Sequence, residues 1–68
     1  MLAVASNDAL AGSAPNIAAL LNRKQYYFTP MKQDAPHTKP RSLVADMNKI
    51  PETAALALAG KQMQPILY

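Results

Sequence analysis

The sequence has no cysteine and no tryptophan, and its 68 residues include only one histidine, two glycines and four aromatic side chains. Without cysteine, the chain has no disulfide scaffold, no cysteine-based zinc site and no thiol nucleophile. With two glycines, it has no glycine-rich loop of the kind that cradles a phosphate group. These shortages argue against most enzyme classes, and the length predicts one small unit rather than two domains.

Charged residues are also scarce, at 16%, and seven lysines and arginines against four acids give a formal net charge of +3. The longest run without a charge, residues 9–22, is shorter than the ~20 apolar residues that a membrane-spanning helix needs. The first residues lack the basic start of a signal peptide. We therefore expect no membrane span, no secretion through a signal peptide, and a cytoplasmic location unless the chain belongs to a particle.

The titratable side chains are dispersed along the chain rather than paired. The nearest acid to His37 is Asp34, on the same proline-broken stretch, and the other carboxylates lie far from both in the sequence. One histidine and one acid make a poor metal-ligand set, and no nucleophile stands at a fixed spacing from a base. The sequence therefore predicts that the chain is not an enzyme and binds neither a cofactor nor a metal ion.

Apolar spacing and proline positions predict a mostly α-helical chain with extended segments. The first helix is expected over residues 14–27, within a segment 13–28, because apolar residues recur there at helical spacing and Pro15 suits a first turn. Residues 1–12 are small and weakly patterned. They predict an arm that is extended or briefly helical.

The second half of the chain predicts a strap, two short helices and a tail. Three prolines keep residues 29–41 extended, as a basic connector. Segment 42–60 is expected to hold helices over 42–50 and 51–59, the second of which is ended by the glycine at the next position. Residues 61–68 form an extended tail with three bulky apolar residues at its end.

The apolar content predicts little independent core. Half of the residues count as hydrophobic, but thirteen of them are alanine, which contributes one methyl group each when buried. We therefore expect the chain to become ordered on larger protein partners. The bulky residues predicted to bind those partners are Leu20, Leu21, Tyr26, Tyr27, Phe28, Met47, Leu56, Ile66, Leu67 and Tyr68.

These features predict a small non-enzymatic structural or assembly protein that lies across the larger components of a multi-protein assembly. By elimination among small assembly proteins, the interpretation is a minor component of a virus or phage particle, a capsid cement or staple located in the virion. The alternative is a small basic nucleic-acid-binding protein. It would use five cations, which are Arg23, Lys24, Lys32, Lys39 and Arg41.

Overall fold

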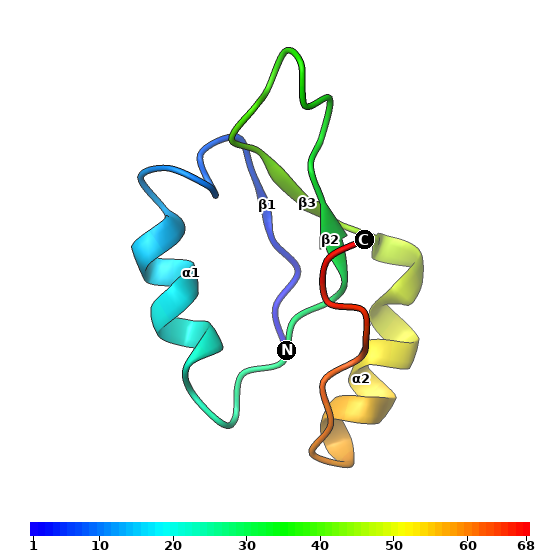
Figure 1. The fold of residues 1–68 in the computed structure, drawn as a ribbon. Helices are drawn as coiled ribbons and strands as arrows, with labels where there is room; N and C mark the ends of the chain where they lie inside the picture. Colours follow the sequence, from blue (N-terminus) through cyan, green and yellow to red (C-terminus); the bar gives the residue numbers. More distant parts are fainter.

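The centre of the fold is a three-stranded antiparallel sheet with one helix beside each edge (Figure 1). A computed structural model describes all of residues 1–68. Its elements in chain order are β1 (Ala5–Ser6), α1 (Ala14–Leu21), β2 (Met31–Lys32), β3 (Leu43–Ala45), a 3₁₀ helix (Met47–Lys49) and α2 (Ile50–Leu58). The molecule is thus a small α/β domain, and the prediction of a mostly α-helical chain is wrong.

Strand β3 lies between the other two strands and pairs with both. The strand order is β1-β3-β2, with Ala5 opposite Val44 in one pair and Met31 opposite Ala45 in the other. The paired strands are only two or three residues long, so each depends on the burial of its neighbours rather than on its own length.

The predicted N-terminal arm, residues 1–12, contains a strand. Side chains alternate between half-buried and exposed from Leu2 to Ser6, which is the period of a strand that is covered on one face. Ahead of β1, the Leu2 N–H donates to the Tyr27 carbonyl and the Thr29 N–H donates to the Leu2 carbonyl, both at 2.8 Å. The start of the chain is therefore held against residues 27–29.

The same contacts explain why the first helix ends at Leu21 instead of at residue 27. Residues 27–29 must be extended to pair with Leu2, and their extended backbone places Phe28 in the core at 1% exposure. Aromatic residues fit this paired, half-buried backbone better than a helix end. Long-range pairing therefore outweighs the local helical pattern.

The predicted connector, residues 29–41, is a strand followed by a folded loop rather than a solvated strap. Its first three residues, Thr29, Pro30 and Met31, are all buried. Farther along, the Ser42 hydroxyl accepts a bond from the Asp34 N–H at 2.9 Å and lies 2.7 Å from the carbonyls of Asp34 and Lys39. This buried hydroxyl closes the loop onto the start of β3.

The helix predicted over residues 42–50 is also wrong, because residues 43–45 form the central strand of the sheet. A central strand buries Leu43 and Ala45 and gains two ladders of backbone hydrogen bonds, which an isolated short helix lacks. Asp46 then starts the 3₁₀ helix, where its carboxylate accepts from the Asn48 N–H at 3.0 Å.

Helix α2 occupies almost the residues predicted for it, because its boundaries are set locally. Pro51 lies in the first turn with Glu52 beside it. At the other end Gly60 has φ of 74°, and the N–H groups of Gly60 and Lys61 donate to the carbonyls of Ala57 and Leu56, both at 2.9 Å. This is the Schellman arrangement, which favours glycine at the left-handed position.

The C-terminal tail returns to the sheet and lies beside β2. The Met31 N–H donates to the Ile66 carbonyl at 2.9 Å, and the Tyr68 N–H donates to the Met31 carbonyl at 3.1 Å. Upstream, the Gln62 side-chain amide accepts from the Phe28 N–H at 2.7 Å and donates to the Phe28 carbonyl at 2.5 Å. The tail is thus joined to the middle of the chain at both of its ends.

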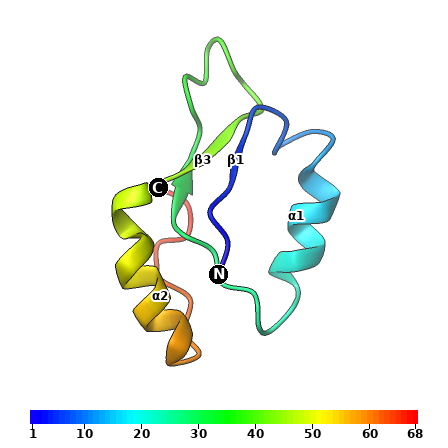
Figure 2. The ribbon, with the colours of Figure 1, turned by 180° about the vertical axis from the view of Figure 1, so that it is seen from behind.

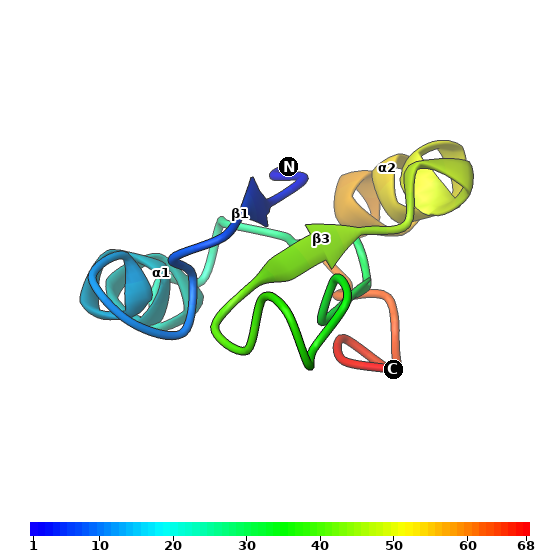
Figure 3. The same cartoon turned by 90° about the horizontal axis from the view of Figure 1, so that it is seen from above.

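The whole molecule is a thin plate. Its extents are 37 × 24 × 14 Å, and the two helices lie to the sides of the sheet rather than over its faces (Figures 2 and 3). Nine of the 68 residues are buried, and the largest buried apolar side chains are those of Phe28, Met31 and Leu43. No helix has both the length and the apolar content needed to cross a bilayer.

A candidate docking groove

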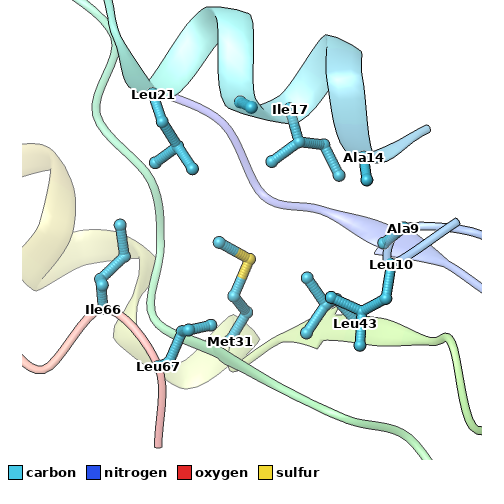
Figure 4. Close-up of a pocket in the computed structure, with 10 residues that line it drawn as sticks. Ala9, Leu10, Ala14, Ile17, Leu21, Met31, Leu43, Ile66 and Leu67 are labelled. Atoms are coloured by element: carbon cyan, nitrogen blue, oxygen red, sulfur yellow. The ribbon is translucent and has the colours of Figure 1, made fainter.

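One face of the plate carries a groove whose lining is entirely apolar (Figure 4). The groove has a volume of about 250 Å³ and lies between α1 on one side and the C-terminal tail on the other. Ten residues line it, namely Ala9, Leu10, Ala14, Ile17, Ala18, Leu21, Met31, Leu43, Ile66 and Leu67.

Helix α1 forms the first wall of the groove. Its groove-facing residues, Ala14, Ile17, Ala18 and Leu21, follow the spacing of one helical face. None of the residues of α1 is fully buried, although Ile17 and Leu20 pack against the small core. An amphipathic helix normally buries its apolar stripe, and here Ala18 and Leu21 remain exposed while Ala14 and Ile17 are half-buried.

The floor and the second wall come from the sheet and the tail. Met31 from β2 and Leu43 from β3 are buried and form the floor, whereas Ile66 and Leu67 stand at the far side (Figure 4). The tail keeps this position because it is hydrogen-bonded to Met31. The groove therefore depends on the whole fold and not on one element.

A polar cluster adjoins the groove at the end of the tail. The ammonium groups of Lys49 and Lys32 lie 4.9 Å and 5.8 Å from the centre of the Tyr68 ring. The pKa of the Tyr68 phenol is raised above its ordinary value because the group is partly desolvated and because the negative charge of Asp46 lies nearby. Each ammonium group is attracted to the face of the ring, and these two contacts help to hold the end of the tail in place.

The structure brings only some of the predicted partner-binding residues together. Leu21, Ile66 and Leu67 line the groove. Phe28 is buried in the chain's own core, and Leu20 is half-buried against that core. The remaining predicted residues lie outside the groove, with Tyr27 and Leu56 half-buried and Tyr26, Met47 and Tyr68 exposed.

The five cations of the alternative interpretation do not form one surface. Arg23 and Lys24 follow α1, whereas Lys39 and Arg41 lie in the loop that precedes β3, at the opposite end of the molecule (Figure 1). The Arg23 guanidinium lies 5.8 Å from the centre of the Tyr26 ring, and Lys39 pairs with Asp34 at 3.2 Å. Phosphate binding gains affinity from many cations on one face, which this arrangement lacks.

The acidic side chains and His37 likewise stay apart. No three of the His, Asp and Glu side chains lie close enough together to hold a metal ion.

Sequence reasoning could have found only part of the groove, namely the wall that follows the helical stripe of α1 and the bulky residues Ile66 and Leu67 at the end of the tail. The contribution of Ala9, Leu10, Met31 and Leu43 has no local signal, because it arises from the folding of distant segments onto one another.

The fold and the groove define a small α/β domain whose sheet is flanked rather than covered by helices and whose apolar groove is open. The chain is 42% identical over 67 residues to a subunit of dipicolinate synthase from Bacillus subtilis (strain 168), a match that covers 98% of the chain and 34% of the relative. No family model matches the chain.

A solved structure gives the same result. The crystal structure of the corresponding dipicolinate synthase subunit from Bacillus halodurans matches 97% of this chain with a TM-score of 0.94 and 47% sequence identity. The match covers 34% of that protein, so the chain spans about one third of the length of both relatives.

These findings correct the functional interpretation of the sequence. The prediction of a minor virion or phage component is wrong, because the proteins that the chain is similar to are subunits of a synthase and not capsid proteins. The same similarity gives no support to the alternative of a small basic nucleic-acid-binding protein. The similarity points toward part of an enzyme, opposite to the prediction of a non-enzymatic protein.

Proposed function

We propose that this chain makes up about one third of a dipicolinate synthase subunit of the kind that both relatives represent. The observation that supports the proposal is the similarity along almost the whole chain, at 42% identity to one relative and 47% identity to another, with a TM-score of 0.94. At a TM-score of 0.94 over 97% of the chain, this chain and the matched segment of the Bacillus halodurans protein have the same fold.

In this proposal the chain supplies shape and packing to the synthase. The groove lining is apolar throughout, and the titratable side chains are dispersed. Acid–base and nucleophilic steps need polar groups placed within hydrogen-bond reach of one another. Those groups would therefore come from the two thirds of the relatives' length that this chain does not match.

An exchange of segments tests the proposal. In the Bacillus subtilis relative, the matching segment is replaced by this chain to give an exchange protein, and the complete synthase is assayed for dipicolinate formation. We expect the exchange protein to form dipicolinate, because the match covers 98% of this chain at 42% identity and the fold agrees with that of the Bacillus halodurans protein.

The matched control is a protein in which the same segment is replaced by this chain with its residues in scrambled order. It keeps length and composition but loses the strands and α2, and it should form no dipicolinate. A folded exchange protein that is inactive in the complete synthase contradicts the proposal. An exchange protein that does not fold contradicts it as well, because the shared backbone would then not be interchangeable.

A further inference from the structure

The groove has the properties of a surface that is covered in the working protein. Three leucine side chains at its rim are about half exposed to solvent, with exposed fractions of 48% for Leu10, 47% for Leu21 and 58% for Leu67. They adjoin the buried floor formed by Met31 and Leu43 without any polar residue between them. Because all ten lining residues are apolar, the groove suits apolar side chains of a covering segment rather than a polar ligand.

The shape of the plate leads to the same conclusion. The chain exposes 4554 Å², whereas a folded monomer of 7.3 kDa exposes about 4,200 Å². The molecule is 14 Å thick, so it holds one layer of elements where domains normally pack two. A second layer would have to pack on a face of the sheet, and the groove, with Met31 of β2 and Leu43 of β3 in its lining, opens on one such face (Figure 4).

The length of the relatives indicates what covers the groove. About two thirds of each relative has no counterpart in this chain. We propose that the groove is the seat of bulky apolar side chains from that remaining part of the same polypeptide, which supplies the second layer over the sheet. This inference rests on the proposed function and assigns a particular face of the chain to the contact.

The chain offers a clean chemical test because it contains no cysteine. Single cysteines are introduced as Leu21→Cys and Leu67→Cys in the groove, and as Leu58→Cys on α2. Leu58 is 92% exposed and lies outside the groove, so it is the matched control. Each variant is made in the chain alone and in the exchange protein, in a background whose other cysteines are replaced by serine.

The measurement is the rate at which a maleimide labels each cysteine under native conditions. In the exchange protein we expect positions 21 and 67 to react about tenfold or more slowly than position 58, because a covered side chain reacts only after local opening. In the chain alone, all three positions should react at similar rates, since each side chain is about half exposed or more.

Two outcomes overturn the inference. Equal rates at positions 21, 67 and 58 in the exchange protein would show that the groove is not the covered face. Slow labelling of positions 21 and 67 in the chain alone, with protection that increases with protein concentration, would show that a second copy of the chain covers the groove.

Dipicolinate formation by the same exchange protein separates the two proposals. An active protein with rapidly labelled groove cysteines overturns only the groove inference. An inactive but folded protein with protected groove cysteines overturns only the proposed function.

Discussion

At the scale of single residues, three buried hydroxyl groups illustrate how such a small core is organised. Thr29, Ser42 and Thr53 are each at 0% exposure. The Thr53 hydroxyl donates to the Lys49 carbonyl at 2.6 Å, and the Ser42 hydroxyl holds the loop before β3. The Thr29 hydroxyl has no hydrogen-bond partner. Since an unpaired buried hydroxyl costs free energy and a paired one does not, the three positions should respond differently to substitution.

Replacing the two threonines by valine should change stability in opposite directions. Thr29→Val removes an unpaired hydroxyl at nearly constant volume and should raise the free energy of unfolding by about 1 kcal/mol. Thr53→Val removes the hydrogen bond to the Lys49 carbonyl and should lower the free energy of unfolding by about 1 kcal/mol. Urea unfolding of the exchange protein, followed by circular dichroism, measures both. A loss of stability in Thr29→Val would contradict this account of the buried hydroxyl.

The Ser42 hydroxyl should be needed for the loop between β2 and β3. Ser42→Ala leaves the Asp34 N–H without its partner at 2.9 Å, and we expect a loss of about 1–3 kcal/mol together with faster exchange of that amide hydrogen. Thr38→Ala in the same loop is the control, because its hydroxyl makes one exposed bond to Ala35 at 3.2 Å. Unchanged exchange at Asp34 in Ser42→Ala would be evidence against the role of Ser42.

At the scale of elements, α2 is the helix that lies where it was expected, because residues next to its two ends set its boundaries. Helix α2 has a proline in its first turn and a glycine just after its end, and both act on the residues next to them. Helix α1 has such a signal only at its start. Its end was decided by the pairing of residues 27–29 with Leu2, which no neighbouring residue indicates.

The strands were missed because they are short and mutually dependent. A three-residue run such as Leu43-Val44-Ala45 fits a helix or a strand equally well by periodicity. Only the alternation from Leu2 to Ser6 carried a strand signal, and that signal is weak because the segment has five residues, of which three are alanine or serine. Strand pairing joins segments far apart in the chain, so its energy cannot be read from any one of them.

The tail offers a test at the same scale. Gln62→Ala removes three hydrogen bonds, two to the backbone of Phe28 and one to the carbonyl of Met63. We expect a loss of about 1–3 kcal/mol and faster amide exchange at Phe28, since its backbone groups lose their partners. Gln64→Ala is the control, because the Gln64 side chain accepts one exposed bond from the Ile66 N–H. Equal effects of the two variants would contradict the role of Gln62.

At the scale of the whole molecule, the thin plate implies low stability in isolation. Ordinary domains of this length are stable by roughly 3–10 kcal/mol. Here three large apolar side chains form most of the core, and the groove leaves leucine side chains in water. Covering that groove would add apolar burial at about 25 cal/mol per Å². Stability should therefore depend strongly on the rest of the polypeptide.

We expect the isolated chain to unfold with a free energy below about 3 kcal/mol and with a broad transition. The same segment in the exchange protein should unfold in one cooperative transition. Circular dichroism at increasing urea concentration compares the two at equal molar concentration. A sharp, concentration-independent transition of the isolated chain at high urea would show that the plate is self-sufficient.

The sequence by itself determined the features that depend on neighbouring residues or on composition. These are the boundaries of α2, the scarcity of large apolar side chains and the dispersal of titratable groups. Tertiary structure decided the sheet, the early end of α1 and the groove, because each of them brings together segments that are far apart in the chain. Local propensities in short segments are worth only tenths of a kcal/mol per residue. Burial of Phe28, Met31 and Leu43 contributes about 1.5–3 kcal/mol for each side chain, so burial prevailed wherever the two disagreed.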